Sequence, residues 1–327
     1  MIPLSDFDIR GAKVDIKQLR ALVTIAETGS VTKAATLLHI VQPAVSRQLR
    51  LLEEDVGTAL FSRGRYGMEL TNAGEIFVEY ARRALAELDR ARAELQPATD
   101  VRGVVTVGLL PSTCELLASE LVAGVAKAFP AVRLRILMGY TGHLQNWLEV
   151  GDVDVSLLYD PKPSPTLQVQ PLLEERLWIV GRPEAGFNAH SPVELRQIAG
   201  EPLILPNAPH GIRSLVEQAY ASAGINLTVT AETNAMSVQK GLVLDGLGFT
   251  ILPSIAIVDD VARGALSAAP LSDANLQRRI VLALPNTRRV PVAVRCVVEL
   301  LVKQMKDAVR CGKWTVARWL GSGVDFN

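Results

Sequence analysis

The residue pattern changes at one place in the chain, and this change constrains the fold more than any other feature. Before Pro97-Ala98-Thr99-Asp100 the apolar residues recur at helical spacing, whereas after it short apolar segments alternate with helices. Alternation of strands and helices predicts a parallel sheet covered by helices. The 327 residues suffice for two domains of ordinary size. We therefore expect an all-α N-terminal domain and an α/β C-terminal domain.

Three short helices and a hairpin are predicted in the N-terminal part. Asp15 can cap a first helix that ends at Thr28-Gly29, and Ser30 can cap a second. Pro43 fits the first turn of a third helix, where its missing N–H costs nothing, and Gly57 ends that helix. The Gly- and Arg-rich segment that follows predicts a small two-stranded hairpin.

The third helix has two chemically distinct faces. Four apolar residues at helical spacing would pack on the first two helices: Val45, Leu49, Leu52 and Val56. The opposite face and the exposed N-terminal end carry Gln42, Pro43, Ser46, Arg47 and Arg50. Gln and Arg can make bidentate hydrogen bonds to adenine and guanine, and Ser can bond a base or a phosphate. The pattern predicts a DNA-recognition helix, although an ordinary solvated face would look similar.

Two neighbouring features favour DNA recognition. Ala34 and Ala35 in the preceding helix are small where two helices must cross closely. Arg63 and Arg65 lie in the hairpin at the distance expected of a wing, where arginine would reach phosphate or the minor groove. The net charge is zero, with 34 basic and 34 acidic residues, so DNA binding requires a local basic surface.

A long helix from Thr71 to about Gln96 is predicted to pair two chains. Its apolar and small residues alternate spacings of four and three, as in a two-helix coiled coil. They are Phe77, Ala81, Ala84, Leu88, Ala91 and Leu95. The alternative is a single amphipathic helix that packs on its own domain.

Residues 16–95 resemble the N-terminal domain of the LysR family of transcriptional regulators. The segments that carry the resemblance are Leu19, Thr32-Lys33-Ala34-Ala35, Leu38-His39, Gln42-Pro43-Ala44-Val45-Ser46-Arg47-Gln48, Leu52-Glu53, Gly57, Leu60-Phe61-Ser62-Arg63 and Leu70-Thr71-Asn72-Ala73-Gly74. The resemblance adds Thr32 and Lys33 to the expected DNA contacts. One departure is Val41, where the family usually has Ser or Thr, so a hydroxyl N-cap worth roughly 1 kcal/mol is missing.

Residues 103–310 resemble the same family more weakly. The resemblance implies a winged helix-turn-helix, a long dimerisation helix and a two-lobed domain like a periplasmic binding protein. We expect crossover strands at 176–180 and 278–284. The expected divisions are 1–14, an N-terminal extension; 15–71, the DNA-binding domain; 72–99, the dimerisation helix and hinge; 100–310, the effector domain; and 311–327, a tail with Trp314 and Trp319.

The resemblance also implies the partners. They are double-stranded promoter DNA, RNA polymerase if the protein is an activator, and a second chain in a homodimer that assembles into a homotetramer. The segments Leu158-Tyr159-Asp160 and Gln170-Pro171-Leu172-Leu173 resemble the subgroup of nitrogen-assimilation control regulators. Some family members, including this subgroup, act without an effector, so oligomer geometry alone is the alternative form of control.

Candidate effector residues lie in loops at strand ends, where ligands bind in such folds. Ser112 and Thr113 follow the first strand and precede a helix whose N-terminus suits an anion, although they could equally be helix caps. Thr141 lies in the next candidate loop. The second lobe contributes Asn207, His210 and Asn234, each also a plausible turn residue. We expect a small anionic metabolite at this place.

Other classes of protein are disfavoured. Three distant cysteines and four histidines show no zinc spacing, and we expect neither a metal nor a cofactor. The chain has no nucleophile elbow, P-loop or dinucleotide fingerprint, so the alternative of an enzyme on the α/β domain lacks a motif. A secreted solute-binding protein would need a signal peptide, and residues 1–14 do not resemble one. The expected location is the cytoplasm, without a membrane partner.

Overall fold

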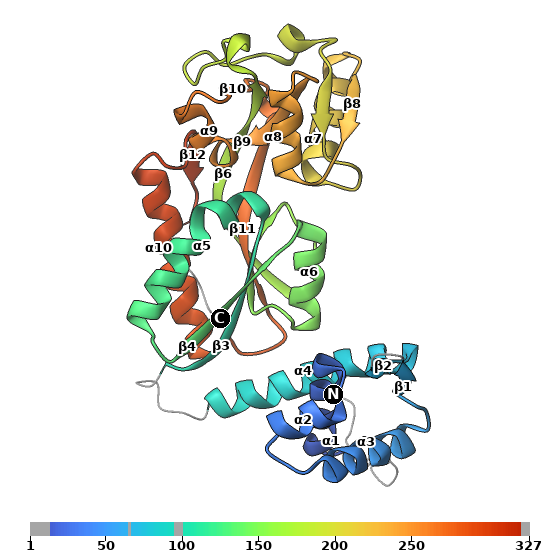
Figure 1. The fold of residues 1–327 in the computed structure, drawn as a ribbon. Coiled ribbons are helices and arrows are strands. Elements are labelled where there is room, and N and C mark those ends of the chain that lie inside the picture. The colour runs from blue at the N-terminus through green and yellow to red at the C-terminus, as the bar shows by residue number, and fades with distance from the viewer. Residues whose placement is uncertain (1–13, 65–66, 95–100, 322–327) are drawn as a thin grey trace. The chain divides into compact units, whose positions relative to one another are not determined.

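The computed structural model describes residues 14–64, 67–94 and 101–321. The chain forms two compact units, Met1–Gln96 and Pro97–Asn327 (Figure 1). The first contains four helices and a hairpin among its described residues, and the second contains all the other strands. No described helix has the length and apolarity that a membrane span requires.

Local capping sets the helices of the first unit. The elements are α1 (Ile16–Thr28), α2 (Val31–Leu37), α3 (Gln42–Val56), β1 (Phe61–Gly64), β2 (Gly67–Leu70) and α4 (Asn72–Glu94). Asp15 caps α1 and Ser30 caps α2, while Gly29 and Gly57 end α1 and α3 in the left-handed conformation, as predicted. Val41 precedes α3 without a side-chain cap, which confirms the expected loss.

The hairpin is anchored to the helices at two places. The Glu53 carboxylate of α3 accepts hydrogen bonds from the amides of Leu60 and Phe61, at 2.7 and 3.2 Å. At the other end the amide of Met68 donates to the carbonyl of Gly29 at 2.9 Å. A Cβ on Gly67 would lie 2.4 Å from that same carbonyl oxygen, so only glycine fits there. The wing is therefore held against the α1–α2 turn.

The second unit has two lobes that share one ten-stranded sheet, in the order β4-β3-β5-β11-β6-β9-β7-β8, with β10 and β12 also paired to β6. The first lobe contains β3 (Gly103–Leu109), α5 (Pro111–Ala128), β4 (Val132–Met138), α6 (Thr141–Val150), β5 (Val155–Tyr159), the first part of β6 (Leu167–Gly181), β11 (Gln277–Pro285), α10 (Val292–Arg310) and β12 (Ala317–Trp319). Alternate residues of β11 face two cores: Ile280 and Leu282 pack with α5 and α10, and Val281 and Ala283 with α6.

The second lobe repeats this layered arrangement. It contains η2 (Pro183–Ala185), η3 (Leu195–Ile198), β7 (Leu203–Leu205), α7 (Gly211–Ala223), β8 (Val229–Glu232), α8 (Met236–Leu244), β9 (Phe249–Pro253), η4 (Ser254–Ala256), α9 (Val258–Ala262), β10 (Ser267–Pro270) and η5 (Ala274–Leu276). Leu177 and Ile179 of β6 pack with α7, and Trp178 and Val180 pack with α8. The cores are thus separate, and β6 runs through both lobes.

Three details differ from the sequence predictions. The sheet is mixed rather than parallel, because β6 pairs antiparallel with β9, β10, β11 and β12. Helix α5 begins at Pro111 and includes Ser112 and Thr113, which were expected to precede the helix, because proline occupies its first turn. The crossover predicted at 176–180 belongs to β6, a single strand of 15 residues that runs through both lobes. The chain returns to the first lobe through two strands, β10 and β11, and the second predicted crossover lies in β11.

The C-terminal segment packs onto the first lobe instead of lying apart as a tail. Trp314 is 1% exposed and belongs to the core beneath α5 and α10. Strand β12 pairs with residues 173–175 of β6, and the amide of Leu320 donates to the Leu172 carbonyl at 2.7 Å. The prediction missed this because a short strand at a sheet edge has little sequence signal of its own.

Candidate functional site

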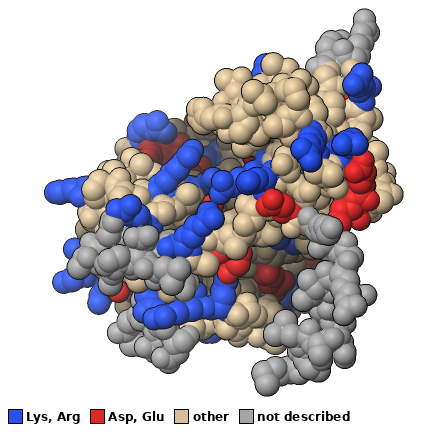
Figure 2. Space-filling view, turned by 90° about the horizontal axis from the view of Figure 1, so that it is seen from below, with Lys and Arg blue, Asp and Glu red and all other residues tan. Residues whose placement is uncertain are grey.

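The polar face of α3 is exposed as the sequence predicts. Gln42, Pro43, Arg47 and Arg50 are exposed, and Ser46 is half-buried. Val45, Leu49 and Leu52 of the opposite face are buried in the core of the unit. The exposed residues of the first unit include Lys33, Arg47, Arg50 and Arg63, and Figure 2 draws Lys and Arg side chains in blue and acidic side chains in red. The overall charge balance therefore conceals a local basic surface.

The polar side chains of α3 make only weak contacts with one another. Nε2 of Gln42 donates to Oγ of Ser46 at 3.0 Å, and Nη1 of Arg50 lies 3.3 Å from Oε1 of Glu54. Both members of the Arg50–Glu54 pair are well exposed, so the pair contributes little and can be exchanged for a phosphate or base. The face can therefore bind nucleic acid without breaking the fold.

The other predicted DNA contacts lie beside α3 in the sequence. Thr32 and Lys33 occupy the first turn of α2 and are exposed. Arg63 is exposed on β1, and Arg65 lies outside the described residues.

The predicted seam of α4 is only partly available. Ala81 is 2% exposed, and Phe77 packs beside it on the unit's own core. Ala84, Leu88 and Ala91 are exposed, while Leu95 lies outside the described residues. In the first turns of α4 the predicted seam therefore packs on its own unit. Only the later part of the helix can contact a second chain.

A cavity of about 320 Å³ lies between the two lobes of the second unit. Its wall contains the first residues of four helices, α5 and α6 from one lobe and α7 and α8 from the other. The rest of the wall is largely apolar, with Leu110, Ile212, Leu215, Met236 and Leu252. The size falls within the range of about 300–1,000 Å³ typical of small-molecule sites.

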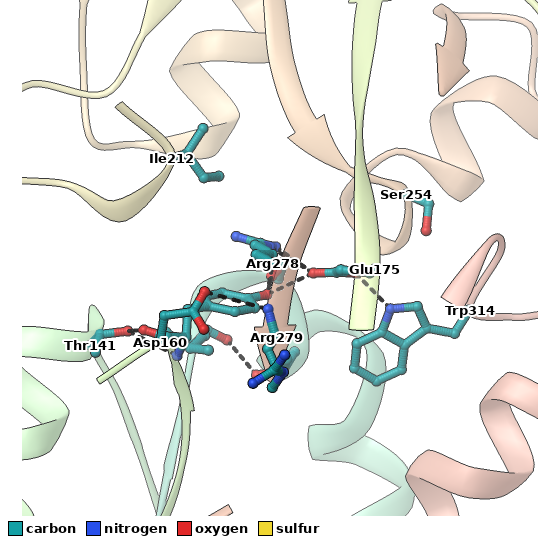
Figure 3. A network of polar contacts seen from close by, with 12 residues as sticks. Thr141, Asp160, Glu175, Ile212, Ser254, Arg278, Arg279 and Trp314 are labelled. Atoms are coloured by element: carbon teal, nitrogen blue, oxygen red, sulfur yellow. Dashed lines mark hydrogen bonds and ion pairs between the residues drawn. The ribbon is translucent and has the colours of Figure 1, made fainter. Parts of the chain in front are cut away.

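Buried polar side chains form a network at the floor of this cavity (Figure 3). Arg278 on β11 donates from Nε to Oε1 of Glu175 at 2.7 Å and from Nη2 to the hydroxyl of Tyr159 at 2.5 Å. Its guanidinium lies 3.4 Å from the centre of the Tyr159 ring. Nε1 of Trp314 donates to the second Glu175 oxygen at 2.7 Å, and Ser112 shares a hydrogen bond with Tyr159 at 3.0 Å.

This network leaves one nitrogen of Arg278 available to a ligand. Nε and Nη2 are used by Glu175 and Tyr159, and within the described ranges Nη1 has no hydrogen-bond or salt-bridge partner. Arg278 is 4% exposed and lines the cavity. The structure therefore presents a buried cation whose one unpaired amino group is accessible from the cavity.

Titration behaviour in the cavity follows from burial and from Arg278. Burial and, to a smaller extent, the positive charge of Arg278 together lower the pKa of His210 to about 4. Burial also raises the pKa of Tyr159 far above its usual range, with Arg278 opposing the shift. His210 is thus a neutral imidazole at neutral pH, and its Nδ1 accepts a hydrogen bond from the amide of Ile212 at 3.2 Å.

Tyr140 of the first lobe reaches across to the second lobe. Its hydroxyl donates to the backbone carbonyl of Asn234, and its ring meets the His210 ring edge-on at 4.8 Å between centroids. All three residues line the cavity. This contact joins the lobes beside the cavity, so a change in the angle between the lobes would have to break it.

Four of the six predicted effector residues line this cavity: Ser112, Thr141, His210 and Asn234. Thr113 is fully buried behind it and donates to the Leu110 carbonyl at 3.0 Å, because the early start of α5 places it within the helix. Asn207 is exposed and is not part of the wall.

Arg278, the charged residue at the centre of the site, was not predicted as a ligand residue, although residues 278–284 were predicted as a strand. A charged residue at the start of a buried apolar strand requires a polar partner. The position of Arg278 in the sequence therefore could have indicated a buried polar site. Glu175, beside the other predicted crossover strand, is that partner. Tyr159 and Gln239 also line the cavity and were not predicted, and Tyr140 lies in the candidate loop that contains Thr141.

The arrangement is suited to binding a small molecule. Within residues 14–64, 67–94 and 101–321, no group of three or more His, Cys, Asp or Glu is placed to hold a metal ion. The cavity combines an apolar wall, a few polar groups and helix N-termini, which attract negative charge.

Comparison with known proteins gives one consistent assignment. Residues 16–75 match the model of the bacterial regulatory helix-turn-helix protein, lysR family, and residues 98–306 match the LysR substrate binding domain. The HTH-type transcriptional regulator BbuR of Bordetella bronchiseptica is 29% identical over 92% of this chain and 93% of its own length. The nitrogen assimilation regulatory protein nac of Klebsiella aerogenes is 29% identical over 74% of this chain and 79% of its own.

Solved structures of full-length regulators share the architecture. A Corynebacterium glutamicum OxyR C206 mutant superposes with a TM-score of 0.60, at 26% identity, over 91% of this chain and 94% of that chain. The structure of CbnR, a LysR family transcriptional regulator, superposes with a TM-score of 0.65 over 89% of this chain and 99% of that chain. Its sequence identity is 22%, so this likeness supports the fold alone. The relatives are transcriptional regulators and not enzymes. This chain belongs to the LysR family of transcriptional regulators, with a helix-turn-helix DNA-binding domain and an effector-binding domain.

Proposed function

We propose that this regulator reads its promoter DNA through the polar face of α3, and that a small anion in the interlobe cavity controls its state. Control by an anion is supported by Arg278, which is buried and lines the cavity. Its Nη1 group has no partner within the described ranges. A cation held in this way favours a negatively charged ligand over a neutral one.

The proposed base-reading residues are Gln42, Ser46, Arg47 and Arg50. Their side chains are exposed or half-buried on one side of a helix whose other side is fixed in the core. Arg63 of the wing and Thr32 and Lys33 of α2 would bind the phosphate backbone and set the orientation of α3. Arg65 belongs to this proposal from its sequence position.

Control by a ligand requires two states of the second unit that bind it with different affinity. The cavity wall contains residues of both lobes, so a ligand that touches both would favour the state in which they are close. The contact from Tyr140 to Asn234 and His210 would be made in that state and broken in a more open one.

We also propose that the chain acts as a homodimer paired through the later part of α4, which assembles further into a tetramer. The support is the exposed stripe of Ala84, Leu88 and Ala91 at coiled-coil spacing. Two paired chains would place two copies of α3 on half-sites about 34 Å apart, one turn of DNA.

Cavity filling tests the proposed control. A Cβ built on Gly142 or Gly211 meets no atom within 4 Å, and both residues line the cavity, so Gly142→Phe and Gly211→Phe add bulk there without a backbone clash. Gly241→Phe is the matched control, because Gly241 has the same open surroundings and does not line the cavity.

The readout is a reporter fused to the promoter upstream of the regulator's own gene, followed during growth on different sole carbon sources. We expect the two cavity variants to hold the reporter at one level and Gly241→Phe to respond like the parent. Parent-like responses from both cavity variants would contradict control through this cavity and would favour control by oligomer geometry alone.

A further inference from the structure

The wall of the interlobe cavity carries very little net charge. Of its residues within the described ranges, Asp160 is the acidic one and Arg278 the basic one, and Glu175 lies behind Arg278 and contacts it at 2.7 Å. His210 is neutral because its pKa is about 4. Arg278 is therefore already neutralised on one side, and it remains the one cation of the described wall.

The wall nevertheless contains two hydrogen-bond donors that have no partner within the described ranges. Nη1 of Arg278 has no partner within the described ranges, and Gln239, which is 3% exposed, has a buried Nε2 that is also unpaired there. Amides at the starts of α5, α6, α7 and α8 add partial positive charge. Buried polar groups of this kind are normally satisfied, so a ligand should bring acceptor atoms.

The remainder of the wall favours an apolar ligand body. Leu110, Ile212, Leu215, Met236 and Leu252 contribute aliphatic surface. Burying apolar ligand surface against them contributes about 25 cal/mol for each Å² removed from water. A strongly hydrated ligand body would lose its water there without regaining hydrogen bonds.

We propose that the cavity binds a monocarboxylate: one carboxylate at Arg278 and the neighbouring helix N-termini, and an uncharged apolar body against the aliphatic wall. This inference rests on the proposed function and specifies its ligand class. A second negative charge would lie in a wall whose one cation is already paired with Glu175, and it would share that wall with the carboxylate of Asp160. A cationic group elsewhere on the ligand would face the helix N-termini.

Four compounds with the same 2-methylpropyl group test the charge assignment. They are 4-methylpentanoate, with one negative charge; 4-methylpentanamide, with none; (2-methylpropyl)malonate, with two; and leucine, the zwitterion. Isothermal titration calorimetry with the full-length protein near neutral pH measures their affinities. We expect 4-methylpentanoate to bind about tenfold or more tightly than each of the others, as a charged hydrogen bond predicts.

Variants locate the binding. Arg278→Gln alone leaves Glu175 buried without its cation, so the double variant Arg278→Gln with Glu175→Gln keeps the charge balance. This double variant should bind 4-methylpentanoate about ten- to hundredfold more weakly than the parent. Arg279→Gln is the control, because Arg279 is the next residue on β11, is half-exposed and lies outside the wall. Gly142→Phe, at a position where an added Cβ meets no atom within 4 Å, provides a second test that leaves the charges unchanged.

The outcomes separate this inference from the proposed function. Tighter binding of the malonate or of leucine, lost in Gly142→Phe, would overturn the monocarboxylate assignment and leave an anion-controlled regulator intact. Tightest binding of the amide, lost in the same variant, would overturn both. If all four compounds fail to bind, the monocarboxylate assignment is wrong, and the reporter response of the cavity variants still decides the proposed function.

Discussion

Trp314 and Glu175, which are 139 residues apart in the chain, are joined by a buried hydrogen bond of 2.7 Å from the indole Nε1 to Oε2. The same carboxylate holds Arg278 through its other oxygen. The C-terminal segment therefore fixes the position of the cation at the floor of the cavity (Figure 3). Trp314 acts through Glu175 and does not itself line the cavity.

Trp314→Phe keeps an aromatic ring, removes the N–H donor and shortens a buried side chain. Oε2 of Glu175 then loses its partner in a fully buried position, which should lower the free energy of unfolding of the second unit by about 1–3 kcal/mol. Trp319→Phe is the control, since the Trp319 indole donates to the backbone carbonyl of Gly321 and is half-buried. Urea denaturation measures both, and equal effects would mean that the Glu175 bond has no special role.

The neutral state of His210 predicts a pH dependence of stability. Its folded pKa of about 4 lies below the ordinary value of 6.5, so the unfolded chain takes up a proton first as the pH falls. This residue should therefore cost stability progressively between about pH 6.5 and pH 4, by at most about 3 kcal/mol.

His210→Asn tests that dependence, because asparagine can also cap α7 and does not titrate. The difference in unfolding free energy between parent and variant should shift in favour of the variant as the pH falls through this range. A difference that is constant with pH would show that His210 is not held neutral.

Arg63 in the wing predicts a salt effect without sequence preference. Arg63→Ala should weaken binding to specific and random DNA alike and reduce the slope of log affinity against log salt by about one unit. Glu69→Ala, on the opposite strand of the hairpin, controls for general damage to the wing. An unchanged slope in Arg63→Ala would exclude a phosphate contact.

Leu88→Arg tests the pairing of two chains through α4. Leu88 is 40% exposed, so arginine costs the single chain little, whereas in a paired seam it would bury a charge. Sedimentation should show loss of the dimer, and Asp89→Arg, one position along on the exposed side, should retain it. Unchanged mass in Leu88→Arg would place the interface elsewhere.

The DNA-binding unit could be predicted almost residue by residue because its signals are local. The caps at Asp15 and Ser30 and the left-handed glycines Gly29 and Gly57 act within a few residues of the helix ends they define. The α4 stripe shows the limit of such reasoning. The spacing that indicates a coiled coil also suits packing on the helix's own unit, and Phe77 and Ala81 are used in the second way.

The cavity could be predicted only in part because its polar groups meet over long separations. Ser112 and Thr141 carry a local signal, a hydroxyl at a strand end, and both line the cavity. Glu175 and Arg278 are 103 residues apart, and neither position alone indicates the other. The register of β6 against β11, which brings them together, depends on the packing of the whole lobe.

Sequence-specific DNA binding through α3 can be tested directly by measuring the affinity of variants. Fluorescence anisotropy of the full-length protein on the DNA upstream of its own gene compares the parent with Gln42→Ala and Arg47→Ala. We predict a loss of about 1–3 kcal/mol for the specific site and little change for random DNA of equal length. If both variants bind the specific site like the parent, α3 does not read the DNA sequence.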